Sequence, residues 1–281
     1  MLISVLGSGS SGNVTLVSDG TVHVLVDLGL AARETERRLA SIGIPPSSIH
    51  AIFLSHEHDD HARGAFRFAQ KHNVPIATTD GAFRSARARF GNDGKARAKS
   101  VDWLRLKSDS GLKLGRLVIE PFETPHDAAE PIGFTIREGR LRFSHVTDIG
   151  HISPAVEEAL EGSHAILIES NHDVEMLRLG PYPDSLKRRV GGRYGHLSNE
   201  ALGRYVARGL PESCEHLFLA HLSLANNHPS IVLESCREAL RRRGGKPPVI
   251  HLTHHDRATG ILRLRERRPV EVDERQGVLA F

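Results

Sequence analysis

The chain has 281 residues, of which 39% are hydrophobic and 25% charged, and its formal net charge is +3. This composition excludes a disordered chain, and the length allows one large α/β domain, which we expect to span residues 1–281. Two cysteines argue against a disulfide framework, and no apolar stretch is long enough to cross a bilayer, so we expect a cytoplasmic protein without a membrane partner.

Strand-like and helix-like patterns follow each other along the chain in a mixed order. Predicted strands cover residues 2–6, 14–18, 22–26, 49–54, 74–79, 101–106, 117–123, 132–137, 141–147, 164–169, 216–220 and 248–252. Predicted helices cover residues 31–42, 61–72, 80–90, 153–160, 198–209 and 229–243. Hairpin-like strand pairs dominate two stretches, and strand–helix alternation follows each of them. This order predicts two β-sheets, each covered by helices on its outer side.

The first turn, between the strands predicted at 2–6 and 14–18, reads LGSGSSGN and matches the G-x-G-x-x-G pattern of dinucleotide-binding loops. That pattern requires a helix after the glycines, because the pyrophosphate binds the free amides of the first helical turn. The next residues, VTLVS, predict a strand instead, so we reject a dinucleotide site. We expect a tight structural bend, with serine hydroxyls that seat a phosphate or fix a neighbouring loop as the alternative.

The segment 51–66, AIFLSHEHDDHARGAF, places four side chains of metal-binding type directly after an apolar strand. His56 and His58 are two apart in an extended segment, so they point the same way and can share one ion. Asp60 and His61, at the start of a helix, can serve a second ion. Imidazole and carboxylate ligands favour zinc, with manganese or iron as alternatives. A polar turn is the competing interpretation, but four such groups behind a buried strand would carry a heavy desolvation cost without an ion.

This segment resembles the H-x-H-x-D-H signature of the metallo-β-lactamase superfamily. Later strand ends carry residues that resemble its remaining ligands: ETPHD contains His126, SHVTDIG contains Asp148, and LFLAHLS contains His221. Asp27, at the end of TVHVLVDLG, resembles the residue that braces the metal loop. The resemblance covers roughly residues 1–235, and it implies an αββα four-layer sandwich of two mixed β-sheets flanked by helices.

The resemblance also implies a centre of two divalent metal ions, with zinc favoured. One ion would be held by His56, His58 and His126, the other by Asp60, His61 and His221, and Asp148 would bridge the pair. Two cations about 3.5–4 Å apart lower the pKa of a shared water and stabilise both the attacking and the leaving oxygen. Asp60 therefore counts as a catalytic residue as well as a metal ligand.

Two further motifs resemble tRNA-processing members of the superfamily such as RNase Z. YGHLSNEAL contains His196, and ILIESNHD contains Glu169. The resemblance implies that His196 gives a proton near the scissile phosphate and that Glu169 orients it. The alternative for His196 is a structural residue beside a helix N-terminus, satisfied by Ser198.

Taken as a whole, the chain resembles the YycJ (WalJ) family of compact superfamily nucleases, through segments such as LSHEHDDHARG, GPYPDSLKRRV and AHLSLANNHP. This implies a 5′-to-3′ exonuclease that acts on nucleic acid, DNA rather than RNA. Basic clusters at 83–107, 186–193 and 237–246 would neutralise phosphates if they flank one cleft, and are otherwise solvated helix faces. The alternatives are a hydrolase of a small ester, thioester or lactam with the same motif, and a non-catalytic metal-binding protein.

The segment IHLTHHDRATG contains three more histidines, His251, His254 and His255. Because the ligand positions are already supplied elsewhere, we expect a strand end at the surface here. Cys214 and Cys236 are expected to be small buried apolar residues.

Overall fold

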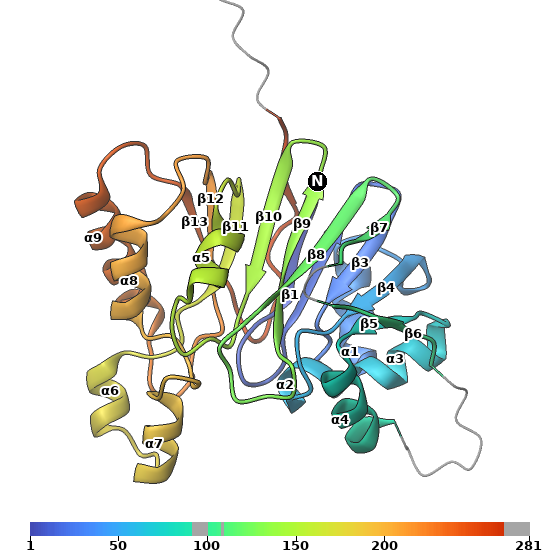
Figure 1. Ribbon diagram of the computed structural model, residues 1–281, viewed down its shortest axis with the longest axis horizontal. Helices are drawn as coiled ribbons and strands as arrows, with labels where there is room; N and C mark the ends of the chain where they lie inside the picture. The colour runs from blue at the N-terminus through green and yellow to red at the C-terminus, as the bar shows by residue number, and fades with distance from the viewer. Residues whose placement is uncertain (92–100, 108–109, 267–281) are drawn as a thin grey trace, which may run out of the picture.

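The computed structural model describes residues 1–91, 101–107 and 110–266. In these residues two β-sheets pack face to face, and helices lie on the outer side of each sheet (Figure 1). This is the αββα sandwich of two mixed sheets that the sequence predicts. Residues 92–100, in the middle of the basic cluster at 83–107, lie outside the described part of the chain.

The first sheet has the strand order β14-β1-β2-β3-β4-β5-β6. Its strands are β1 (Leu2–Gly7), β2 (Val14–Ser18), β3 (His23–Val26), β4 (Ile49–Phe53), β5 (Ile76–Thr78), β6 (Trp103–Arg105) and β14 (Leu262–Arg263). Strands β1 to β3 pair antiparallel, whereas β3 to β6 pair parallel. The parallel half brings the carboxyl ends of its strands to one edge, where ligand sites of such sheets form.

The second sheet has the order β13-β12-β11-β10-β9-β8-β7 and repeats this plan. Its strands are β7 (Leu112–Leu114), β8 (Leu117–Glu123), β9 (Ile132–Glu138), β10 (Leu141–Val146), β11 (Ala165–Glu169), β12 (His216–Ala220) and β13 (Val249–Leu252). Strands β7 to β10 are antiparallel, and β10 to β13 are parallel. Both sheets therefore combine a meander with a parallel half.

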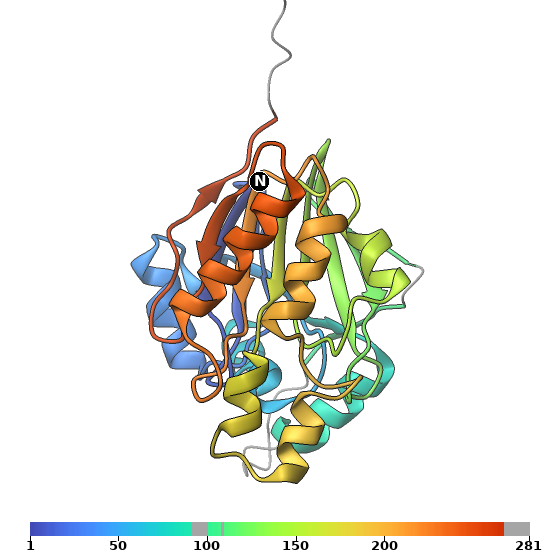
Figure 2. The same cartoon turned by 90° about the vertical axis from the view of Figure 1, so that its left-hand side faces the viewer.

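The helices form the two outer layers and one projecting pair (Figures 1 and 2). On the side of the first sheet lie α1 (Ala32–Ser41), the short 3-10 helix η1 (Pro46–Ser48), α2 (Asp59–Ala62), α3 (Ala65–His72) and α4 (Asp80–Phe90). On the side of the second sheet lie α5 (Pro154–Leu160), α8 (Asn199–Arg208) and α9 (Pro229–Arg243), while α6 (Val174–Leu179) and α7 (Asp184–Val190) project beyond its end. Among the described residues, no helix is both long and apolar enough to cross a membrane.

Apolar side chains of both inner faces fill the space between the sheets. Phe53 of β4 and Phe134 of β9 meet there edge to face, with ring centroids 5.8 Å apart. Two further apolar layers lie between each sheet and its helices. Because β11 is covered on both faces, its sequence AILIE is buried at every position, including the carboxylate of Glu169 at its end.

The predicted helix 61–72 is interrupted, because α2 ends at Ala62 and α3 begins at Ala65. The break lies at Gly64, whose amide donates to the carbonyl oxygen of Leu28 over 2.9 Å. A Cβ at Gly64 would lie 2.0 Å from the carbonyl oxygen of Leu30, so only glycine permits this approach. The contact anchors the start of α3 to the segment that follows β3.

The sequence does not predict α6 and α7. Each is only six or seven residues long, which is too short for a clear helical periodicity. The prolines Pro181 and Pro183 between them also favour a loop assignment. The projecting pair therefore emerges only in three dimensions.

Candidate metal centre

The residues predicted for the site follow strands that end at one edge of the sandwich. Asp27 follows β3, the HEHDDH segment follows β4, and His126 lies beyond β8. Asp148 and His221 follow β10 and β12, and Glu169 is the last residue of β11. Strands from both sheets thus deliver their terminal side chains to the same region.

Three of these residues have left-handed backbone conformations, which non-glycine residues adopt rarely. The φ angles are 58° at Asp27, 54° at Asp148 and 56° at His221. Each residue lies just beyond the end of a strand. Such conformations cost free energy and persist where the surrounding structure enforces them, commonly at functional sites.

His56, His58 and His126 form a group that we call the three-histidine cluster. His56 Nε2 lies 3.1 Å from His58 Nδ1, and His126 Nε2 lies 3.3 Å from the same nitrogen. Three ring nitrogens therefore point to a common centre.

Asp60, His61, Asp148 and His221 form a second group, the mixed cluster. His61 Nε2 lies 2.5 Å from Asp148 Oδ2, and His221 Nε2 lies 3.1 Å from Asp60 Oδ2. Asp148 Oδ2 is also 3.3 Å from His56 Nε2. Asp148 thus reaches both clusters, as its predicted position between them requires.

The ring nitrogens that face away from the clusters are held by other groups. His126 Nδ1 donates to the Gly195 carbonyl oxygen at 3.1 Å. In the mixed cluster, His61 Nδ1 donates to Asp27 Oδ2 and His221 Nδ1 to Glu169 Oε1, both at 2.9 Å. Such partners fix the ring orientation and leave Nε2 directed at a bound cation.

The donors of the two clusters fit divalent cations. Within each cluster they lie within 4.8 Å of one another, and imidazole nitrogen and carboxylate oxygen are ligands of zinc, manganese and iron. Asp148 Oδ1 is buried, and its neighbours are His221 Nδ1 at 3.1 Å and His196 Nδ1 at 3.2 Å. A buried carboxylate beside the second carboxylate of Asp60 is costly unless cationic groups or a metal ion neutralise the charge. The site is therefore suited to binding metal ions.

The two clusters differ in their electrostatics. Burial, together with His61, lowers the pKa of His56 well below its ordinary value, and burial with His126 lowers that of His58. Burial alone would also lower the pKa of His221, but Asp148 and neighbouring carboxylates raise it to about 9. The carboxylates of the mixed cluster therefore create a negative potential that attracts a cation.

Glu169 and His196 form a pair at the edge of the mixed cluster. His196 Nδ1 lies 2.7 Å from Glu169 Oε1. The other oxygen, Oε2, accepts the backbone N–H groups of Ile149 at 3.0 Å and Leu197 at 3.2 Å. Burial opposes the charge of Glu169, but His196 and His221 lower its pKa to about 2. Its carboxylate and Asp148 hold the pKa of His196 well above the usual value although burial would lower it.

Ser198, the partner in the alternative for His196, has another role. Its hydroxyl accepts the backbone N–H of Ala201 at 3.1 Å and caps α8. His196 turns instead to Glu169, as described above. The geometry thus favours the Glu169 pairing over a structural histidine satisfied by the helix cap.

The glycine- and serine-rich bend between β1 and β2 packs against the mixed cluster. Ser8 Oγ accepts the backbone N–H of His221 at 2.8 Å. Asn13 Nδ2 lies 3.0 Å from His61 Nε2, and its Oδ1 accepts the Gly9 N–H at 2.8 Å. The bend therefore braces the loops that carry His221 and His61, which favours the alternative of a bend that fixes a neighbouring loop over a purely structural turn. Asn13 itself is a residue that the sequence reasoning missed.

Ser55 is a second residue that the sequence reasoning missed. Its hydroxyl lies 2.9 Å from Asp27 Oδ1 and 2.9 Å from His56 Nδ1. It thereby links the brace of the mixed cluster to a ring of the three-histidine cluster. A polar residue directly between an apolar strand and HEHDDH was the available signal.

A cleft of about 390 Å³ opens over the clusters. Its walls include the predicted residues His58, Asp60, Asp148, His196 and His221. Other groups that line it are Ser10, Asp59, Arg89, Asn171, Tyr182, Arg189, Val190 and Ser223. The predicted residues therefore face a space that a substrate can enter.

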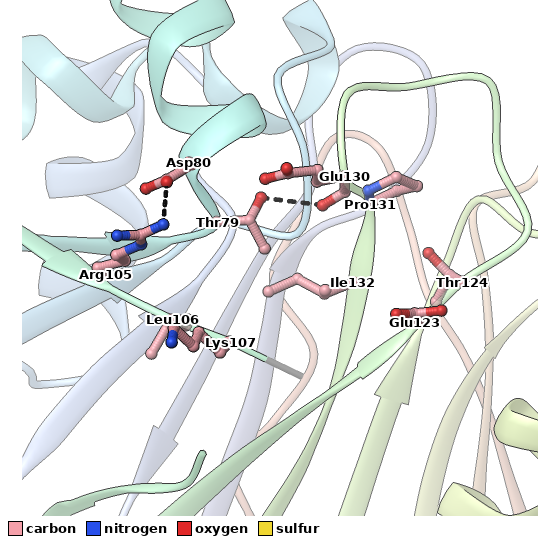
Figure 3. A pocket seen from close by; sticks show the side chains of 10 residues that line it. All are labelled: Thr79, Asp80, Arg105, Leu106, Lys107, Glu123, Thr124, Glu130, Pro131 and Ile132. Atoms are coloured by element: carbon pink, nitrogen blue, oxygen red, sulfur yellow. Dashed lines mark hydrogen bonds and ion pairs between the residues drawn. The ribbon is translucent and has the colours of Figure 1, made fainter. Parts of the chain in front are cut away.

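A second cavity, of about 420 Å³, lies between the N-terminal end of α4, the end of β8 and the start of β9 (Figure 3). Thr79 Oγ1 donates to the Glu130 carbonyl oxygen at 2.9 Å, and Asp80 pairs with Arg105. Glu130 also accepts the Gly81 N–H at 2.7 Å. Its lining shares no residue with the first cleft. These contacts tie the loop that carries His126 to the N-terminus of α4.

The histidines of β13 and of the loop after it join neither cluster. His251 stacks on Phe218 with ring centroids 4.4 Å apart, and its Nε2 lies 3.0 Å from His216 Nδ1. The His254 carbonyl oxygen accepts the Ser8 N–H at 3.0 Å. The expected strand end is present, because the edge strand β13 ends at Leu252, and His254 and His255 lie half-buried against the first bend in the loop beyond it. Cys214 and Cys236 are free and buried, as expected.

The sequence of this chain is similar to those of known proteins. The profile of the β-lactamase superfamily domain matches residues 23–212. Exodeoxyribonuclease YycJ of Bacillus anthracis is 33% identical over 262 residues, which cover 92% of this chain and 97% of that protein. Exodeoxyribonuclease WalJ of Streptococcus pneumoniae is 32% identical over 224 residues, or 80% of this chain and 82% of the relative.

Among solved structures, the metallo-β-lactamase fold protein YhfI of Bacillus subtilis superposes with a TM-score of 0.67. The alignment covers 92% of this chain and 98% of YhfI, at 17% sequence identity. At this identity the similarity is one of fold.

Proposed function

The chain belongs to the β-lactamase superfamily domain family, with the YycJ and WalJ exodeoxyribonucleases as relatives over most of its length, and we propose that it is a dinuclear-metal DNA exonuclease that degrades strands from the 5′ end. The family, these relatives and the two clusters together support a metal-dependent nuclease. One observation carries the proposal: the clusters share Asp148 and lie beside the Glu169–His196 pair in one cleft.

We assign one set of metal ligands to each of the two clusters. His56, His58 and His126 would hold one ion, Asp60, His61 and His221 the other, with Asp148 between them. Two bound ions, with zinc favoured, supply Lewis acidity, a water of lowered pKa and charge stabilisation at the attacking and leaving oxygens. The chain's own contribution is to fix the donor atoms, through Asp27, Glu169 and the Gly195 carbonyl.

His196 is assigned as the proton donor to the leaving oxygen. Because its Nδ1 is bonded to Glu169, Nε2 is the atom left to give a proton. Burial would lower the pKa of His196, but the carboxylates of Glu169 and Asp148 raise it, which favours the protonated ring. Asp60, which lines the cleft, is assigned a catalytic role beside its ligand role because its carboxylate would hold an ion next to the reacting phosphate.

Two further assignments concern the domain boundaries and the cellular compartment. We propose one domain over residues 1–281, supported by the pairing of β14 with β1, which joins the two ends of the described chain. Residues 267–281 lie outside the described part. A cytoplasmic setting is proposed from the two free cysteines, which a reducing compartment preserves.

The test is an assay of the purified holoprotein with zinc or manganese on end-labelled single- and double-stranded DNA and RNA. We expect the label of a 5′-labelled DNA strand to appear at once as a mononucleotide, whereas a 3′-labelled strand shortens progressively. Bis-p-nitrophenyl phosphate, a thioester and nitrocefin serve as small substrates. Hydrolysis of the thioester or nitrocefin with intact DNA would refute the proposal.

A further inference from the structure

Two arginines line the metal cleft from different parts of the chain. Arg89 belongs to α4, beside the first sheet, and Arg189 belongs to α7, in the projecting pair. Arg89 pairs with an aspartate of the HEHDDH segment, and Arg189 pairs with the aspartate that follows His126. The two guanidinium groups therefore reach the cleft from different elements; α4 and α7 are seen in Figure 1.

Each arginine is paired with an aspartate next to a predicted metal ligand. Arg189 Nε donates to Asp127 Oδ2 at 2.6 Å, and Asp127 follows His126. Arg89 pairs with Asp59, which lies between His58 and Asp60. The proposed metal ligation does not use either aspartate, and Asp127 Oδ1 also lies 3.4 Å from His126 Nε2. Each ion pair therefore lies directly beside the proposed metal ligands without being part of them.

These ion pairs are open to solvent. The side chains are 55% exposed for Arg189 and 34% for Asp127, and 58% exposed for Arg89 and 47% for Asp59. Ion pairs this exposed contribute little to folding stability, so replacing one partner costs little. The guanidinium fork that binds a carboxylate also fits a phosphate in the same bidentate geometry.

The two arginines also offset negative charge at the cleft. Asp59 and Asp127 would repel a phosphodiester strand that enters the cleft, and the arginines neutralise them. The pKa of Arg189 is raised, first by its hydrogen bond to Asp127 and also by Asp148 and Asp60. The guanidinium thus lies within electrostatic range of the metal clusters, where the scissile phosphate would bind.

We propose that Arg89 and Arg189 exchange their aspartates for backbone phosphates of the DNA strand, each binding a phosphate near the one that is cleaved. The two arginines then position the strand over the clusters. This inference rests on the proposed nuclease function and specifies how that site holds its polymeric substrate.

The experiment measures steady-state kinetics of the holoenzyme on a fluorescent single-stranded DNA between 50 and 200 mM salt. Arg89→Ala and Arg189→Ala should each raise KM roughly tenfold at the lowest salt, with a much smaller change in kcat. The slope of log(1/KM) against log salt should fall by about 0.7 for each lost phosphate contact. Arg189→Lys should retain most of that slope because it keeps the charge.

Two control variants separate phosphate binding from support of the metal loop. Asp127→Asn frees Arg189, so KM should stay unchanged or fall. If Arg189 acts only by holding Asp127, this variant will instead raise KM as Arg189→Ala does, and the inference is overturned. Arg178→Ala removes another exposed arginine, which is paired with Glu175 outside the cleft lining, and should change neither KM nor the slope.

The outcomes distinguish this inference from the function on which it rests. A wild-type enzyme that leaves DNA intact overturns the proposed function and this inference together. A wild-type enzyme that degrades DNA, with KM and salt slope preserved in well-folded Arg89→Ala and Arg189→Ala, overturns the inference alone.

Discussion

The three-histidine cluster and the mixed cluster lie side by side, share Asp148 and yet are built on different chemistry. The first contributes only imidazole nitrogens, and burial lowers the pKa values of His56 and His58. The second adds carboxylates, which raise the pKa of His221 to about 9. A neutral nitrogen set suits zinc, whereas mixed nitrogen and oxygen donors also suit manganese or iron. The comparison shows how one edge of the sandwich can bring together two groups of metal-binding side chains that differ in charge.

The groups that hold the histidine rings of the two clusters also differ in charge. Carboxylates of Asp27 and Glu169 hold the mixed cluster, while a backbone carbonyl and the Ser55 hydroxyl hold rings of the three-histidine cluster. A carboxylate partner makes an imidazole a stronger ligand. We therefore expect the mixed cluster to retain its ion longer when a chelator is added.

Replacing Asp148, which contacts both clusters, should have the largest effect on activity. Asp148→Asn removes a charge that reaches both groups, and we expect both ions to bind more weakly. DNA hydrolysis should fall roughly 10⁴-fold, because several kcal/mol of transition-state stabilisation are lost. Turnover and metal content per chain are measured together, with circular dichroism to verify folding. Two fully retained ions would contradict a shared role for Asp148.

Removing one ligand from each cluster separates them, with a smaller effect expected. His58→Ala should empty the three-histidine cluster alone, and Asp60→Ala should weaken the mixed cluster alone. Each should lower activity roughly 10²- to 10³-fold, as for the loss of one electrostatic element of a site. Metal analysis should find about one ion per chain in each variant. Full activity in either one would refute the ligand assignment.

The smallest effect is expected from a support that touches no cation. Asp27→Asn replaces the carboxylate behind His61, so the mixed cluster should lose roughly 10- to 100-fold in metal affinity. Competition titration with a chelating dye measures each site. Asp19→Asn is the matched control, because that carboxylate accepts backbone N–H groups in the turn between β2 and β3. An equal loss in both clusters would contradict the separate supports.

Much of the fold could be predicted because it has a local signature. The alternation of VTLVS and the apolar run AILIE mark β2 and β11, and both strands appear within one residue of their expected bounds. The break at Gly64 could not be predicted, since it depends on contacts with Leu28 and Leu30. The short helices α6 and α7 could not be predicted, because neither is long enough to show the periodic pattern of a helix.

For the site, the sequence by itself determined the kinds of side chain and their placement after strands. HEHDDH is a dense local pattern, and ligand chemistry can be recognised from residue type and spacing. The later candidates each follow an apolar strand, which restricts where their side chains can lie. Residue type and strand position are properties of neighbouring residues, so one sequence suffices to show them.

Only the tertiary structure decided which atoms meet. Asn13 lies against His61, Ser8 holds the His221 amide, and Arg189 pairs with Asp127 across separate elements. These contacts join residues that are far apart in the chain and individually unremarkable in sequence. Their pairing depends on how two sheets stack and where loops cross, and long-range packing leaves no local pattern to read.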